Sequence, residues 1–321
     1  MTTVVQDGRG TKPDVKLVEV GPRDGLQNEA DWVPTSTKLG FIERLVSAGL
    51  AEIEVTSFVS PKRIPQLADA TELVAQLVKR EGTTFSALVP NLQGLNRALQ
   101  GGIRAVSVFA SASEAFSRQN INCSIDESLD RFAPVIASAR EQQVPVRAYI
   151  SCALGCPYSG AVAPDAVAQL ALRLSALGCG EISLSDTIGV GTPFAVRRMI
   201  SAVADLVPID HLAGHFHDTY GQAIANIYAS LDLGVRIFDA STAGLGGCPF
   251  APGSSGNVAT EDVVYLLEGL GLTTGVDLDK LLLADKYITL SLRRETGSKV
   301  ARARSRHVAP SIGQPRPFFT R

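Results

Sequence analysis

The chain repeats one pattern eight times, in which a short apolar run is followed by a longer stretch with amphipathic, helical spacing. Strands that alternate with helices imply a parallel sheet, because each helix carries the chain back to the same edge. The pattern predicts strands over 16–20, 52–57, 84–89, 105–110, 146–151, 181–185, 212–217 and 236–241. It predicts helices over 35–48, 68–79, 92–99, 124–142, 165–177, from 193, 222–233 and 260–270. Eight such units fit the dimensions of a closed (β/α)8 TIM barrel, an α/β fold.

An open, doubly wound sheet is the competing architecture. It would usually carry a glycine-rich dinucleotide turn after its first strand, and Gly21-Pro-Arg-Asp-Gly25 is not such a turn. We therefore predict a flexible N-terminal segment over 1–14, a catalytic barrel over 15–275 and a short helical C-terminal extension over 276–321. Within the extension, Asp279 to Leu292 has a helical pattern, and the remainder is too rich in glycine and proline for regular structure.

Composition excludes several classes of protein. Hydrophobic residues make up 45% of the chain and charged residues 19%, which supports a large core and argues against disorder. A formal net charge of −2 does not suggest a nucleic-acid partner, and no apolar run is long enough for a membrane span. The N-terminus has no secretory pattern, and five irregularly spaced cysteines do not indicate a disulfide framework, so we expect a cytoplasmic protein.

Two of the four histidines, His215 and His217, end the seventh predicted strand. Residues two apart on a strand point to the same side, so both imidazoles would face one metal ion. The alternative is one core histidine and one exposed histidine. Because half of the histidines of the chain occur at this one strand end, we favour the metal interpretation.

Arg23 and Asp24 follow the first strand, where a barrel carries its active site. Glycines at 21 and 25 and the intervening Pro22 indicate a fixed turn that holds both side chains over the barrel mouth, although a surface ion pair is the alternative. Glu52 and Glu54 share one face of the second strand, and we expect one of them to enter the barrel. An unpaired buried carboxylate is costly, and Arg23 is a candidate partner.

A glycine-rich segment, residues 244–257, follows the eighth strand and contains five glycines and two prolines. Within a compact barrel, such a loop is more often a functional lid than a flexible linker. We expect Cys248 to be accessible in its middle and Asn257 to enter the site at its end. Asp186, after the sixth strand, belongs either to the site or to the cap of the next helix.

Together these positions form a mixed nitrogen and oxygen ligand set of Asp24, His215, His217 and Asn257. Oxygen ligands favour Mg²⁺ or Mn²⁺, and imidazole also suits Co²⁺ and Zn²⁺. No cysteine cluster has zinc-site spacing, and we interpret Cys152 and Cys156 as barrel packing. We therefore predict Mg²⁺ or Mn²⁺ with open positions for substrate.

Specific segments carry a family resemblance over residues 15–295: Glu19–Glu29, Glu54–Lys62, Asn120–Ser124, Ser151–Tyr158, Ser185–Pro193, His215–Gly221, Gly244–Pro249 and Gly253–Asp262. At these residues the sequence resembles the 3-hydroxy-3-methylglutaryl-CoA lyases of the metal-dependent lyase and Claisen-condensing TIM-barrel superfamily. The resemblance implies an acyl-CoA substrate and retro-Claisen cleavage to acetyl-CoA and acetoacetate.

The resemblance also implies roles for individual residues. Asp24, His215, His217 and Asn257 would hold the metal, with His215 also counted among the catalytic residues. Arg23 would contact the thioester-derived oxygen, Cys248 would act from the mobile loop, and Glu54 and Asp186 would support the site. We further expect Lys62 and Arg118 to contact the CoA phosphates, Gln27, Asn120 and Thr187 to contact the substrate, and the chain to form a homodimer or larger homo-oligomer.

Two positions depart from the family pattern. Ala30 stands where the family often has lysine, and Arg63 stands where close relatives commonly have tryptophan. Both lie near the first two strand ends, so the alternatives include a lyase for another 3-hydroxy-3-alkylglutaryl-CoA or for citramalyl-CoA. A Claisen-condensing enzyme and a non-catalytic barrel are more distant alternatives. Retention of the ligands, Arg23 and Cys248 argues against the non-catalytic barrel.

Overall fold

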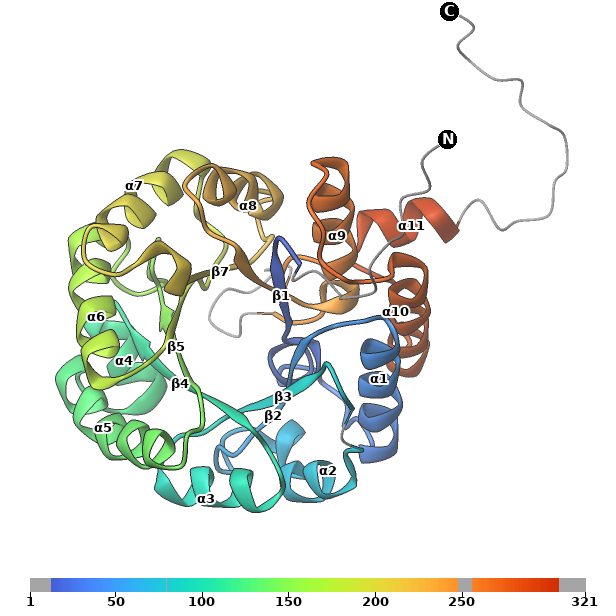
Figure 1. The fold of residues 1–321 in the computed structure, drawn as a ribbon, viewed down its shortest axis with the longest axis horizontal. Coiled ribbons are helices and arrows are strands. Elements are labelled where there is room, and N and C mark those ends of the chain that lie inside the picture. The colour runs from blue at the N-terminus through green and yellow to red at the C-terminus, as the bar shows by residue number, and fades with distance from the viewer. Residues whose placement is uncertain (1–12, 79, 248–255, 306–321) are drawn as a thin grey trace, which may run out of the picture.

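The computed structural model describes residues 13–78, 80–247 and 256–305. Eight strands close into a barrel in chain order, and helices surround them as an outer ring (Figure 1). The strands are β1 (Lys16–Glu19), β2 (Glu52–Ser57), β3 (Thr84–Leu88), β4 (Ala105–Ser111), β5 (Val146–Ser151), β6 (Glu181–Asp186), β7 (Leu212–Phe216) and β8 (Ile237–Ala240). Every strand pair is parallel, and β1 closes the barrel because Val18 lies opposite both Glu52 and Asp239. The predicted TIM barrel is confirmed.

The helices follow the strands as the sequence pattern predicts, with two additions. They are α1 (Thr35–Ser47), α2 (Ala70–Gln76), α3 (Leu92–Gln100), α4 (Glu114–Ile121), α5 (Ile125–Glu141), α6 (Pro164–Leu177), α7 (Pro193–Ala204), α8 (Ala223–Asp232), α9 (Thr260–Gly269), α10 (Leu278–Leu292) and α11 (Lys299–Ser305). Ser124 and Glu127 form the predicted capping box of α5. None of the helices in the described parts of the chain is both long enough and apolar enough to cross a membrane.

Helices α4 and α11 correct the sequence prediction. The pattern did not predict α4, which begins after Ser113, whose side chain accepts a hydrogen bond from the Phe116 amide. The prediction of an irregular chain after α10 is wrong for α11. That helix is anchored by Asp262, whose carboxylate accepts hydrogen bonds from Ser298 and from the amides of Lys299 and Val300.

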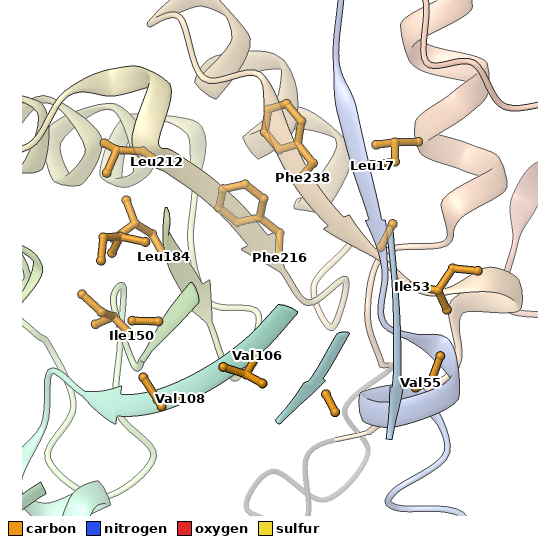
Figure 2. Packing of buried hydrophobic residues seen from close by; sticks show 14 of the residues in the cluster. Leu17, Ile53, Val55, Val106, Val108, Ile150, Leu184, Leu212, Phe216 and Phe238 are labelled. Carbon is orange, nitrogen blue, oxygen red and sulfur yellow. The ribbon is translucent and has the colours of Figure 1, made fainter. Parts of the chain in front are cut away.

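Apolar side chains of the strands pack in the layer between the barrel and the helices. Leu17, Ile53, Val106, Ile150 and Phe238 belong to this buried cluster, drawn in Figure 2. Because side chains alternate along a strand, the neighbouring positions point into the barrel. The sequence alternation of the strands therefore separates an apolar outer face from an inner face with different chemistry.

The inner face of the barrel is polar and charged. Arg147 of β5 pairs with Asp239 of β8, and Lys16 of β1 pairs with Glu181 of β6, although neither strand pair is adjacent in the sheet. Contacts between non-adjacent strands require both side chains to cross the interior. Buried charges are stable when they are paired and hydrogen-bonded, so this layer forms a connected network beneath the barrel mouth.

Candidate active site at the carboxyl ends of the strands

The segment after β1 forms a π-helical turn, Gly21–Gly25, that presents Arg23 and Asp24 at the barrel mouth. The amides of Arg23, Asp24 and Gly25 all donate to the carbonyl of Val20, at 3.1, 2.7 and 3.1 Å. Gly25 allows the turn to approach its neighbours, because a Cβ there would lie 2.8 Å from the Cβ of Leu245. The predicted fixed turn is present, and its tight packing explains the glycine.

Glu19 fastens this turn to the segment that follows β8. Its carboxylate accepts hydrogen bonds from the Gly21 amide at 2.9 Å and from the amide and hydroxyl of Thr242 at 2.9 and 2.7 Å. The hydroxyl of Thr260, at the start of α9, donates to the same carboxylate at 2.7 Å. One buried side chain therefore ties together the two chain segments that carry Asp24 and Asn257.

Asn257 is brought beside the end of β7 by a short stretch of backbone pairing. His217 and Asn257 form an isolated antiparallel bridge, and the amides of Asp218 and Val258 donate across it to Gly256 and Phe216. Gly246 lies directly beneath this stretch with φ +123°, and a Cβ there would meet the Asn257 side chain at 2.7 Å. Both ends of the glycine-rich segment are therefore tightly packed against the site.

Asp24, His215 and His217 converge on one buried point. The Nε2 atoms of His215 and His217 each lie 3.9 Å from Oδ2 of Asp24, and one potential ligand atom from each residue lies within 4.8 Å of the others. The side-chain amide of Asn257 is 2.9 Å from the same Oδ2. Two imidazole nitrogens and a carboxylate oxygen that face one another at this spacing are a ligand set that suits a divalent metal ion.

The protonation states at this point fit cation binding. Burial, together with the neighbouring His215, lowers the pKa of His217 to about 4, so its imidazole is neutral near pH 7. Burial alone would raise the pKa of Asp24, but Arg23 and the two imidazoles lower it to about 2. A neutral imidazole and an ionised carboxylate are the forms that ligate metals.

Arg23 lies beside the metal ligands, held from two sides. The residue is 6% exposed, Nε donates to Glu54, and Nη1 lies 2.6 Å from Oδ1 of Asp24. Ser107 and Tyr149 donate their hydroxyls to Glu54, and the guanidinium lies 5.2 Å from the centre of the Tyr149 ring. Burial lowers the pKa of Arg23, but the Glu54 and Asp24 carboxylates more than compensate and raise it overall. Arg23 thus pairs with a carboxylate of the second strand as predicted, and the structure identifies it as Glu54, whereas Glu52 pairs with Lys16.

A cavity of about 610 Å³ opens above this cluster. Its lining includes Arg23, Asp24, His215 and His217, together with the three residues predicted to contact substrate, Gln27, Asn120 and Thr187. Gln27 also donates to Oδ1 of Asp24 at 2.9 Å. Three of the four predicted metal ligands and all three predicted substrate contacts therefore line one cavity, and Asn257 reaches Asp24 from outside the lining.

Other predicted residues lie elsewhere. Asp186 is buried and accepts hydrogen bonds from the amides of Val190 and Gly191, so it shapes the turn after β6; burial raises its pKa to about 6 against the effect of these donors. Lys62 and Arg118 are not among the residues that line the cavity, and Arg118 pairs with Glu114 at 3.8 Å. Cys248 lies outside the described residues.

Sequence reasoning missed two residues that matter to the cavity, Arg131 and Tyr149, and it named Arg63 only as a departure from the family pattern near the second strand end. Arg131 of α5 and Arg63 both line the cavity. Tyr149 lines it from β5 and contacts Glu54. An inward position at the end of a strand could have identified Tyr149, whereas nothing in the local pattern around Arg131 distinguishes it from a surface arginine of a helix.

Comparisons with known proteins identify the family and the fold of the chain. The family model described as HMGL-like matches residues 14–288. A 3-hydroxy-3-isohexenylglutaryl-CoA/hydroxy-methylglutaryl-CoA lyase of Pseudomonas aeruginosa is 57% identical over 289 residues, which cover 90% of this chain and 96% of that protein. The crystal structure of hydroxymethylglutaryl-CoA lyase from P. aeruginosa superposes with a TM-score of 0.90 at 56% identity, covering 92% of this chain and 99% of that one. An HMG-CoA lyase from Acinetobacter baumannii, solved with coenzyme A and 3-methylmalate, superposes with a TM-score of 0.87 at 35% identity, covering 94% and 98%.

Proposed function

The chain belongs to the HMGL-like family, and from that membership we propose that it is a metal-dependent lyase that cleaves 3-hydroxy-3-methylglutaryl-CoA to acetyl-CoA and acetoacetate. The observation that carries the proposal is the convergence of Asp24, His215 and His217 beside the buried Arg23 at the floor of one cavity. A site that can bind a divalent cation thus lies next to an arginine that can stabilise a developing negative charge on the substrate. A retro-Claisen cleavage needs both.

Asp24, His215, His217 and Asn257 would hold the metal ion, which we propose to be Mg²⁺ or Mn²⁺ because an oxygen-containing set with open positions suits these ions. When bound, the ion supplies Lewis-acid polarisation of substrate oxygen atoms. Asp239 and Gln27 hydrogen-bond to two of these ligands, His215 and Asp24 respectively. This support keeps the ligands oriented before the ion arrives.

The bond that breaks joins C2 and C3 of the acyl group. A general base takes the proton of the 3-hydroxyl, C3 becomes the ketone of acetoacetate, and the electron pair of the broken bond passes into the thioester as the enolate of acetyl-CoA. We assign Arg23 to the enolate oxygen, because its charge is buried and its orientation is fixed by Glu54 and Asp24. The enolate then takes a proton at C2. The family resemblance assigns that proton transfer to Cys248.

The cavity of about 610 Å³ has apolar as well as charged residues in its lining. Its walls carry Phe109, Phe116 and Phe132 together with Leu88 and Val59. These apolar lining residues favour a second candidate substrate, a 3-hydroxy-3-alkylglutaryl-CoA with a longer alkyl group. The P. aeruginosa relative bears the name of both an isohexenyl and a methyl substrate. Arg63 and Arg131 are the cations at this cavity that we propose for an anionic part of the acyl-CoA.

The test is a thioester-cleavage assay on the purified full chain with Mg²⁺ and Mn²⁺, with products identified by mass. We expect acetoacetate and acetyl-CoA from the methyl substrate and the matching ketone from longer homologues. Asp24→Asn keeps the shape of the ligand and removes its charge, so it should abolish cleavage. Absence of cleavage with every homologue and either metal would contradict the proposal. A homo-oligomeric state and a cytoplasmic location remain predictions.

A further inference from the structure

Asp239 is a buried carboxylate that contacts His215 from inside the barrel. It is 1% exposed and lies on β8, and its Oδ2 is 3.1 Å from Nδ1 of His215. The Ser183 hydroxyl donates to the same oxygen at 2.8 Å, and Nη2 of Arg147 lies 2.5 Å from Oδ1. Four strands, β5 to β8, thus contribute one side chain each to a single hydrogen-bonded network that ends at His215, a candidate metal ligand.

The donors and acceptors of this hydrogen-bonded network determine which ring nitrogen of His215 carries the proton. An ionised carboxylate only accepts hydrogen bonds, so the hydrogen shared with His215 belongs to Nδ1. In a neutral imidazole the other nitrogen then carries the lone pair, and this is Nε2, the atom that faces Asp24. We propose that Asp239 is a positioning residue that holds His215 in the Nδ1–H tautomer, so that Nε2 is already prepared as a metal ligand. This inference rests on the proposed metal site.

The contacts of Arg147 distinguish the proposed role of Asp239 from simple neutralisation of the arginine charge. Arg147 also pairs with Glu181 at 2.8 Å, and Glu181 pairs with Lys16 further from the barrel mouth. Both carboxylates therefore neutralise the same arginine, but only Asp239 touches a proposed ligand. Within the described residues Nδ1 of His217 has no hydrogen-bond partner, so a carboxylate fixes the tautomer of His215 but not that of His217.

The first experiment measures Mn²⁺ affinity of the metal-free full chain by calorimetry or by the electron paramagnetic resonance signal of free Mn²⁺. Asp239→Asn should raise the Kd for Mn²⁺ by about 10–100-fold, the usual effect of losing such a partner. Saturating Mn²⁺ should restore most of kcat. The matched control is Glu181→Gln, which removes the other carboxylate partner of Arg147 and should leave the Kd unchanged. Equal affinity in folded Asp239→Asn and wild type, or equal weakening in both variants, would overturn the inference.

The second experiment needs no variant and no metal. Nitrogen-15 NMR of histidine-labelled, metal-free wild type distinguishes the protonated from the unprotonated ring nitrogen. We expect Nδ1 of His215 to be protonated, and a proton on Nε2 would overturn the inference even if Asp239→Asn failed to fold. Failure of the proposed function is a different result: wild type would then bind no Mn²⁺ and cleave no thioester, whichever tautomer is seen.

Discussion

Nη1 of Arg23 lies 2.6 Å from Oδ1 of Asp24, so the residue proposed to stabilise the enolate is paired directly with a residue proposed to bind the metal. The pair shares its support, since Glu54 holds the other side of the guanidinium and Gln27 donates to the same Asp24 oxygen. A substitution of Arg23 should therefore also change metal affinity, and a substitution of Asp24 should also change the position of the Arg23 guanidinium. Measurements of turnover and of metal affinity need to be made on the same variants.

Arg23→Gln should lower kcat by about 10²–10³-fold, because a donor aimed at developing charge typically contributes about 3–4 kcal/mol to transition-state stabilisation. The control is Arg97→Gln, which should leave turnover unchanged, since neither Arg97 nor its partners Thr71 and Phe58 are among the residues that line the cavity. Steady-state kinetics at saturating Mn²⁺ measure both. Turnover near the wild-type value in Arg23→Gln would show that the enolate is stabilised elsewhere.

Removal of the metal should lower both activity and stability. A ligand at 100 times its Kd stabilises the folded state by about 2.7 kcal/mol, so Mn²⁺ added to chelator-treated protein should raise the melting temperature. Asp24→Asn should lose this rise, because it removes the charged ligand. Calorimetric scans of both proteins with and without Mn²⁺ make the comparison. A rise of the same size in Asp24→Asn would mean that Mn²⁺ binds at another site.

The sequence predicted the barrel because eight short apolar runs alternate with longer helical stretches, a repeat that fits the dimensions of a closed parallel sheet. Helix α4 escaped prediction since it is short and its cap at Ser113 is a weak local signal. Helix α11 escaped for a different reason. Its anchor is Asp262, which is distant in the chain, and such a tertiary contact cannot be read from the composition of residues 299–305.

The residues of the site likewise fall into those that local sequence patterns predict and those that depend on contacts distant in the chain. His215 and His217 were predicted from spacing on one strand, and Arg23 and Asp24 from a glycine-bounded turn. Asp239 and Arg147 were not identified, because their contact joins β5 to β8 across the interior and depends on strand register and barrel closure. The sequence pattern indicates which residues point inward but not which of them meet.

The stability of the metal-free protein should fall on the acid side because of His217. Its pKa is about 4 in the folded state and about 6.5 when unfolded, so the unfolded state binds more protons between these values. The contribution is present above pH 6.5 and is lost as the pH falls to 4, and it amounts to about 3 kcal/mol. Urea unfolding of wild type and His217→Gln across this range should show a shallower decline in the variant. Parallel curves would contradict burial of a neutral imidazole.

Glu19→Gln should destabilise the protein by about 1–3 kcal/mol, because an amide nitrogen replaces one acceptor and leaves buried donors of the Gly21 turn or of Thr242 unsatisfied. The matched control is Glu43→Gln on the exposed face of α1, which should change the free energy of unfolding little. Urea unfolding measures both. Because Glu19 ties the Asp24 turn to the Asn257 segment, we also expect weaker Mn²⁺ binding in Glu19→Gln but not in the control.

Arg63→Trp should shift the preference among acyl groups. Arg63 lines the cavity beside Val59 and Ile64, and an indole there would occupy space next to the apolar wall. Loss of room for one or two methylene groups changes discrimination by about 1–3 kcal/mol, so kcat/KM for a long 3-alkyl substrate should fall about tenfold or more relative to the methyl substrate. Arg63→Met is the comparison, since it removes the charge and keeps a flexible side chain. If the two variants change the ratio equally, the charge of Arg63 governs selectivity. If only Arg63→Trp changes it, the available space does.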